Sequence, residues 1–211
     1  MRGTSVTDIQ LTFINQSTDA NNNDIVIFQK NVATSFNQLA VAWKVVSASS
    51  VGGNPVTFPM TTLAAGASDS FGNYSLMKPA QHGQMFAAVH TPTGIDLRPA
   101  ATPAGANEIT VTNGMAQGSI NASIYRDNRL LAIQTGIPPQ QKAVFAFNPT
   151  IWIGMVPHIV EGQVMDSAVQ ATINTELSLQ GIASADIVMT GGGKGPTATP
   201  FTFTLQNVVK A

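Results

Sequence analysis

Five aspartate and asparagine residues stand within six consecutive positions of the segment STDANNNDIVIF, and their side-chain oxygens could ligate a calcium ion. An EF-hand loop beginning at Asp19 would place Asp19, Asn21 and Asn23 at its first, third and fifth positions, as calcium requires. Its sixth position is Asp24 instead of glycine, and its twelfth is Lys30 instead of a bidentate glutamate. We therefore favour an Asx-rich turn before a strand, and keep a non-EF calcium site with Asp19 and Asp24 as the second interpretation.

The segment ADIVMTGGGKGPT has glycines and a lysine after a predicted strand, as a phosphate-binding loop does. Such a loop needs a glycine five positions before its Gly-Lys pair, and then a helix whose N-terminus holds the phosphate. Val188 occupies the position of that glycine, and Lys194 is followed by Gly195 and Pro196. The segment is therefore predicted to be a loop between two strands.

The three histidines do not form a predicted metal or catalytic group. On one continuous strand His82 and His90 would face the same side but lie roughly 26 Å apart. His158 follows Pro157 at a predicted strand end and has no acidic neighbour within two residues. All three are expected to be surface or strand-end side chains.

Nucleophilic and carboxylate catalysis also lack a signature. In AGASDSFG the pattern Gly66-x-Ser68-x-Ser70 ends in serine where a nucleophile elbow has glycine. The three glutamates and eight aspartates are scattered, so a catalytic pair would need a tertiary contact that the sequence does not reveal. We expect a protein that is not an enzyme and has no cofactor.

The composition favours contact with other molecules over ionic recognition. Charged residues make up 10% of the chain, compared with about 25% in typical globular proteins. Ten Lys and Arg against eleven Asp and Glu leave a net charge of -1, and the basic residues are dispersed, so no nucleic-acid partner is expected. A net charge near zero favours association with copies of itself or with a surface.

The chain contains no cysteine, so the fold uses neither disulfides nor thiolate metal ligands. Its start, MRGTSVTDIQ, lacks the apolar region of a signal peptide, and no stretch approaches 18 apolar residues. We expect a soluble protein, and secretion or display at a cell surface by another route stays open.

The elements that must position any site are predicted to be β-strands, because apolar residues alternate with polar ones. In VTDIQLTFIN, Ile9, Leu11 and Phe13 share one side while Asp8 and Gln10 share the other. Gly, Pro and Asn clusters separate such segments, as in an all-β antiparallel sandwich of about 10–13 strands. The strands are expected near 6–15, 24–29, 38–47, 55–62, 83–90, 108–113, 118–126, 129–135, 141–147, 150–156, 171–180, 184–190 and 199–208.

Two connections have recognisable turn chemistry. Asp127 and Asn128 stand between two alternating runs and both tolerate positive φ, which predicts a two-residue hairpin. Pro138-Pro139 and Asn148-Pro149 then mark a bend and a corner, so residues 117–156 are expected to form a meander.

Domain organisation is predicted to be a single sandwich over 1–211, with at most one short helix. The helix candidate is VEGQVMDSAVQATI, and strand or loop is the default there because of Gly162 and the β-branched residues. The Pro/Gly/Ala-rich interval 91–108 is the candidate connection for a subdivision into 1–95 and 105–211.

Two non-catalytic functions fit these observations. The first is self-assembly into a structural fibre, sheath or ordered inclusion, because an uncharged polar surface packs against itself without burying charges. The predicted strand in FTFTLQNVV has no lysine to deter edge pairing, and Phe201, Phe203 and Leu205 are its candidate assembly residues.

The alternative is a lectin-like or pore-forming toxin protein that binds a glycan or membrane surface. Tyr74 and Tyr125 are the candidate ligand-binding residues, whereas Trp43 and Trp152 lie in apolar strands typical of a core. TINTELSLQGIASADIVMT could form a membrane-inserting hairpin with its turn at Gly181, or an ordinary amphipathic hairpin.

Overall fold

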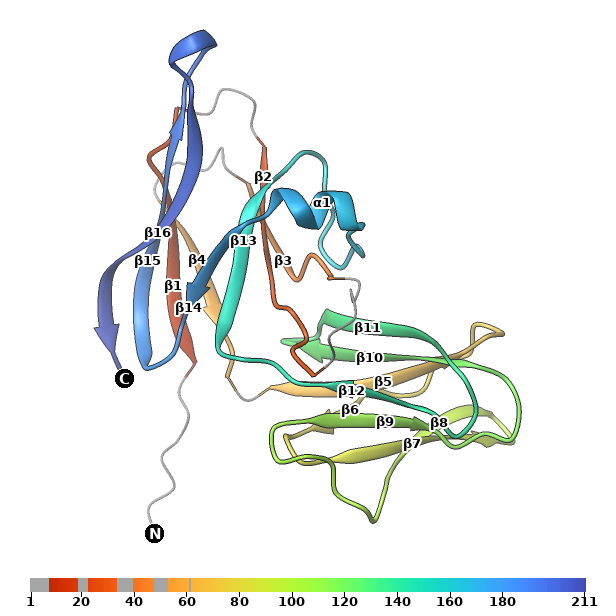
Figure 1. Cartoon of the computed structure of the whole chain (residues 1–211). Helices are drawn as coiled ribbons and strands as arrows, with labels where there is room; N and C mark the ends of the chain where they lie inside the picture. Colours follow the sequence, from red (N-terminus) through yellow and green to blue (C-terminus); the bar gives the residue numbers. More distant parts are fainter. Residues whose placement is uncertain (1–7, 19–22, 34–39, 48–52, 61) are drawn as a thin grey trace.

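A computed structural model of the chain shows strands arranged in two pairs of facing sheets (Figure 1). It describes residues 8–18, 23–33, 40–47, 53–60 and 62–211. The predicted all-β, mostly antiparallel sandwich fold is confirmed, with sixteen strands in the described residues instead of 10–13. Two pairs are parallel, β1 with β15 and β7 with β9.

The first sheet pair is built from the two ends of the chain. One sheet has the order β16 (Thr199–Lys210), β15 (Ile182–Gly192), β1 (Ile9–Asn15) and β4 (Asn54–Phe58). The other has the order β14 (Thr175–Ser178), β13 (Thr150–Val156), β2 (Asp24–Phe28) and β3 (Lys44–Ser47).

The second sheet pair is built from the middle of the chain. One sheet has the order β11 (Arg129–Ile137), β10 (Ile120–Arg126), β5 (Leu63–Asp69) and β6 (Lys78–Ala80). The other has the order β12 (Lys142–Phe145), β9 (Ile109–Asn113), β7 (Met85–Thr91) and β8 (Gly94–Pro99). In Figure 1 its strands run in a clearly different direction from those of the first pair.

The chain enters the second sheet pair after β4 and leaves it after β12, so this pair is inserted between strands of the first. The interval 91–108, expected as a connection, contains β8, and the strands on either side of it share one sheet. Strand pairing thus groups the chain by its middle and its two ends, whereas the subdivision that the sequence left open, 1–95 and 105–211, would cut through the second sheet pair.

Alternating burial explains why these segments form strands. On β1, Ile9, Leu11 and Phe13 are at most 2% exposed, whereas Gln10 faces solvent. The strands that sequence patterns missed are β5, β6 and β8. β5 reads LAAGASD, whose small side chains give little β-propensity, and β6 has three residues around Pro79.

The hairpin at Asp127-Asn128 is confirmed. Both residues have positive φ, 53° and 57°, and Arg126 pairs with Arg129 across the turn. The helix is α1 (Ser167–Thr172), where the Asp166 side chain accepts a hydrogen bond from the Val169 N–H. It starts after Gly162, whose φ of 85° is incompatible with a helix.

The prediction of a hairpin around Gly181 is wrong. Gly181 does lie in a turn, with a φ of 68°, but β14 and β15 on either side of it belong to different sheets. β14 pairs with β13, and β15 pairs with β1 and β16. Both segments alternate because each has one face on the shared core.

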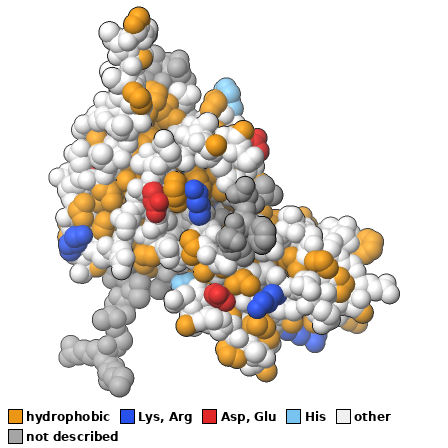
Figure 2. Space-filling view, in the orientation of Figure 1, with side chains coloured by type: hydrophobic (Ala, Val, Ile, Leu, Met, Phe, Trp, Pro, Cys, Tyr) orange, Lys and Arg blue, Asp and Glu red, His pale blue; other side chains and the backbone are white. Residues whose placement is uncertain are grey.

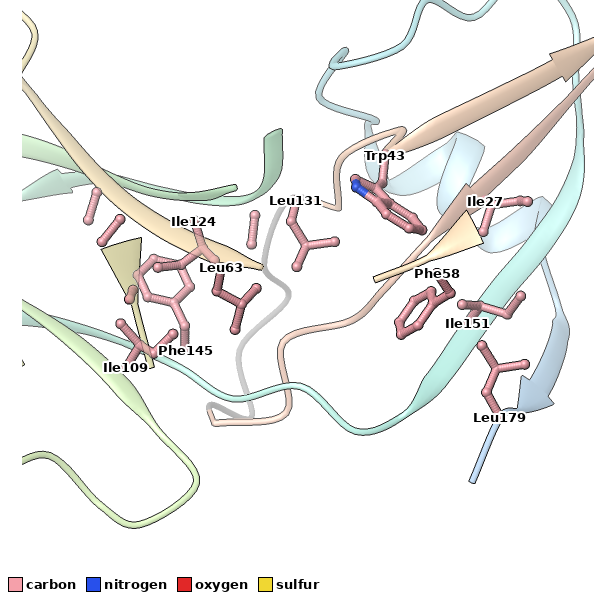
Figure 3. Packing of buried hydrophobic residues seen from close by; sticks show 14 of the residues in the cluster. Ile27, Trp43, Phe58, Leu63, Ile109, Ile124, Leu131, Phe145, Ile151 and Leu179 are labelled. Atoms are coloured by element: carbon pink, nitrogen blue, oxygen red, sulfur yellow. The ribbon is translucent and has the colours of Figure 1, made fainter. Parts of the chain in front are cut away.

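A buried junction joins the two sheet pairs. Trp43, fully buried before β3, donates its indole N–H to the Arg126 carbonyl at 3.0 Å and meets the Phe58 ring edge-on at 5.4 Å. Arg126 donates to the Pro59 carbonyl at 2.8 Å. Figure 3 shows Trp43, Phe58 and Leu131 between the apolar side chains of the first pair and those of the second, so one core runs through both.

Replacing Trp43 by Phe is expected to lower the free energy of unfolding by about 2 kcal/mol, because the buried Arg126 carbonyl loses its donor. Urea denaturation measures the change. Trp152→Phe is the matched control, since that half-buried indole packs under the Lys30 ammonium and is expected to cost less. Equal losses of unfolding free energy in Trp43→Phe and Trp152→Phe would contradict this role of the indole N–H.

Candidate functional site

Two of the predicted calcium ligands, Asn23 and Asp24, lie at the start of β2. Asp24 opens the strand and pairs with Ser47 and Val156, and Asn23 precedes it. Asp19 and Asn21 lie outside the described residues. Over the described ranges no three His, Asp or Glu side chains are grouped as a metal would need, and the calcium site stays a prediction.

The other candidate groups are dispersed. His82 and His158 lie in exposed turns and His90 is exposed on β7, as expected for surface and strand-end side chains. Ser68 lies within β5, where its hydroxyl accepts a hydrogen bond from Asn121 at 3.3 Å. Lys194 and its glycines form the tip of the β15–β16 hairpin, closed by the single turn η1 (Gly195–Thr197). None of the described helices has the length and apolar character needed to cross a membrane.

The three predicted assembly residues all lie on β16, but their side chains face inward. Phe203 is 6% exposed, and Phe201 and Leu205 pack against the same core. Their role in assembly stays a prediction, and these side chains contribute to the core. The alternation places Thr202, Thr204 and Gln206 on the solvent side instead.

The strand β16 is nevertheless an edge. Among the described residues it pairs with β15 alone, over a register from Gly192↔Thr199 to Ile182↔Lys210. Its other side therefore carries a row of backbone N–H and C=O groups able to receive another strand. A register shift near Asn207, which has a φ of 49°, interrupts the strand towards its end.

The second exposed feature is the apolar loop, residues 70–77, which joins β5 to β6. Phe71, Tyr74 and Leu76 are 83%, 78% and 78% exposed, and Met77 follows them at 48%. Figure 1 places the end of β5 at the far end of the second sheet pair, and Figure 2 shows apolar side chains gathered there on a face with few charges. Large apolar groups gathered on a surface mark interaction sites.

Asp69 fixes the shape of the apolar loop. One carboxylate oxygen accepts hydrogen bonds from the backbone N–H groups of Phe71 and Asn73, both at 2.9 Å, and the other accepts from the Asn73 side chain at 2.8 Å. The side-chain bond from Asn73 is the main cause that lowers the pKa of Asp69. Four apolar side chains are thus held out by a hydrogen-bonded turn.

The two predicted ligand-binding tyrosines share the outer face of one sheet. Tyr125 on β10 lies opposite Ala64, and Tyr74 forms a bridge with Ser68, four residues further along β5. At the usual rise this separates them by about 13 Å along the strand. Met77 lies between them, next to Gly66.

Sequence reasoning identified Tyr74 but missed Phe71, Leu76 and Met77. A signal existed, because SFGNYSLM combines turn residues with four large apolar side chains that do not alternate. No strand can bury such a set on one face.

No family model matches this chain, and neither does any curated protein or solved structure compared with it.

We predict that Asp69→Ala accelerates hydrogen exchange at the amides of Phe71 and Asn73, because both lose their acceptor. Asp69→Asn keeps one acceptor oxygen, so its exchange rates at these amides should fall between those of the wild type and those of Asp69→Ala. Asp96→Ala, which removes a partly buried carboxylate that accepts a hydrogen bond from the Leu97 N–H on β8, is the matched control. Unchanged exchange in Asp69→Ala would refute the role given to this side chain.

The same loop should loosen in acid. Because the pKa of Asp69 is lowered from its ordinary value of 3.8, its stabilising contribution is complete above that value. The contribution is lost as the pH falls through the lowered pKa. Exchange rates at Phe71 and Asn73, corrected for intrinsic pH dependence, should therefore rise only below about pH 4.

Proposed function

We propose that this protein is non-enzymatic and works by associating with copies of itself through the open edge of β16. The observation that carries the proposal is the position of a 12-residue strand at the end of its sheet, with Phe203 buried and Phe201 and Leu205 packed against the core. Over residues 201–206 the strand offers backbone hydrogen bonds while its exposed side chains, Thr202, Thr204 and Gln206, are polar.

The β16 edges of two copies of the chain can pair with each other. Their outward side chains Thr202, Thr204 and Gln206 are uncharged, so an antiparallel pair of two β16 strands opposes no like charges. Pro200 and the irregularity at Asn207 bound the regular stretch, which leaves residues 201–206, about 20 Å of strand, for pairing. Two copies related by a two-fold axis would form one eight-stranded sheet.

The other edge of this sheet is less suited to pairing. β4 has five residues and contains the exposed Pro55, which has no N–H to donate. The two-fold β16 pair is therefore the first step of assembly, and a fibre, sheath or inclusion would use further contacts between such dimers.

The double variant Thr202→Lys/Thr204→Lys is expected to lower the association constant at least tenfold, because the pair would bring four lysines together. Sedimentation velocity over a range of protein concentrations measures this. Gln10→Lys is the control, because Gln10 is exposed on the same sheet but on an inner strand. A wild-type chain that stays monomeric at high concentration would contradict the proposal, as would equal association by the variant.

A second function, contact with a cell surface, is supported by the apolar loop. Burying one such side chain gains about 1.5–3 kcal/mol, so Phe71 and Leu76 together would give weak but measurable binding to a lipid interface. The adjacent Tyr74 combines an apolar ring with a polar tip, as interfacial residues do.

Phe71→Ser/Leu76→Ser is expected to reduce cosedimentation with neutral phosphatidylcholine vesicles about tenfold or more, since both apolar contacts are lost. Val160→Ser, which changes an exposed valine in another loop, should bind like the wild type. Absence of vesicle binding by the wild type would remove this second proposal.

A further inference from the structure

A groove crosses the outer face of the second sheet pair, between β5, β6 and the Asp127-Asn128 hairpin. Its volume is about 470 Å³, and Ala64, Met77, Pro79, Gln81, Tyr125 and Asn128 are among its lining residues. This size lies within the range of sites for small organic ligands. The groove adjoins the apolar loop through Met77.

Tyr125 provides an aromatic ring at this groove. Its ring lies over Gly66, where a Cβ atom would come within 3.2 Å of the Tyr125 Cε2 atom. Glycine at 66 and alanine at 64 leave room for the ring to lie close to β5, and the half-exposed side chain is accessible to a ligand. A ring supported in this way can stack against an apolar ligand face.

Polar groups surround the ring. Throughout the described residues the side chains of Gln81 and Asn128 and the hydroxyl of Tyr125 have no protein hydrogen-bond partner, and all three residues line the groove. Each amide offers donors and an acceptor, and the hydroxyl offers both. The groove thus suits a ligand that carries many groups able to donate and accept.

The groove has little net charge. Asp127 is the one acidic or basic residue in its lining, and its carboxylate lies 2.5 Å from Arg129 and 3.5 Å from Lys44. A charged ligand would therefore find no unpaired partner among the lining residues, whereas a neutral polar ligand needs none.

We propose that this groove binds a neutral saccharide. A sugar ring has an apolar C–H face that stacks on an aromatic ring, and hydroxyl groups that match the free amides of Gln81 and Asn128. A longer saccharide chain could also reach Tyr74 past Met77 on the same sheet face. The inference deepens the proposed cell-surface contact and rests on it for its setting, since a lipid-inserting loop would act beside a glycan-binding groove.

The test is an array of neutral, sialylated and sulfated glycans, followed by calorimetric titration of the wild type with the free neutral oligosaccharides that bind. Tyr125→Ala is expected to lose at least tenfold in affinity because the stacking surface is removed. Tyr125→Phe keeps the ring and its packing over Gly66. Its affinity for the saccharide should therefore fall only a few-fold. Tyr74→Ala should leave the affinity for a short saccharide unchanged.

The inference is overturned if no neutral glycan binds, if only sialylated or sulfated glycans bind, or if Tyr125→Ala and Tyr125→Phe both bind like the wild type. Circular dichroism on each variant confirms that the fold is retained. Because titration uses free saccharide and the vesicle experiment uses lipid without glycan, failure of the groove and failure of the apolar loop are distinguished.

Discussion

The arrangement of the two sheet pairs depends on the contact between Trp43 and the end of β10. The Trp43 indole bonds to the Arg126 carbonyl, and the Arg126 guanidinium reaches the Pro59 carbonyl and lies 4.7 Å from the Phe58 ring. Burial lowers the pKa of Arg126 to about 10, so the side chain is still a cation at neutral pH. Its carbonyl and ring contacts offset part of the cost of burying that charge.

This junction also positions the surface features. Asp127 and Asn128, which border the groove, follow Arg126 directly, and Asp127 is held by Lys44 from the first pair and Arg129 from the second. Arg129 in turn binds Glu161 at 2.5 Å. These partly exposed ion pairs add little stability by themselves, but they fix the orientation of the hairpin beside the junction.

The proposed contacts lie on different sheet pairs, and this separation has a functional consequence. β16 belongs to the first pair, whereas the apolar loop and the groove belong to the second. Association through β16 would leave both free and present them in two or more copies. Weak binding of each copy to a surface would then combine, because the second contact forms at a high effective concentration.

The sequence predicted the strands well where one face is buried against large side chains. Ile9, Leu11 and Phe13 illustrate this, and the turn at Asp127-Asn128 followed from residues that tolerate positive φ. The pattern failed at β5, because alanine and glycine bury a face without a strong apolar signal. It also placed Phe201, Phe203 and Leu205 at an edge without indicating that their side chains point into the core, since period two does not say which face is covered.

The candidate sites could not be predicted in full from the sequence, because they depend on tertiary contacts. The apolar loop depends on the side chain of Asp69, and the groove depends on Tyr125 meeting Gly66, 59 positions away along the chain. Neither relationship produces a recognisable pattern in the local sequence. The low charge, by contrast, was evident from composition alone and is the property shared by β16 and the groove.

The central claim is that the open edge of β16 receives a second copy of the chain. Hydrogen exchange of backbone amides, compared between dilute and concentrated protein, tests it most directly. The account predicts that protection of residues 201–206 rises with concentration while that of β15, already paired on both sides, does not change. Exchange in β16 that is independent of concentration would contradict it.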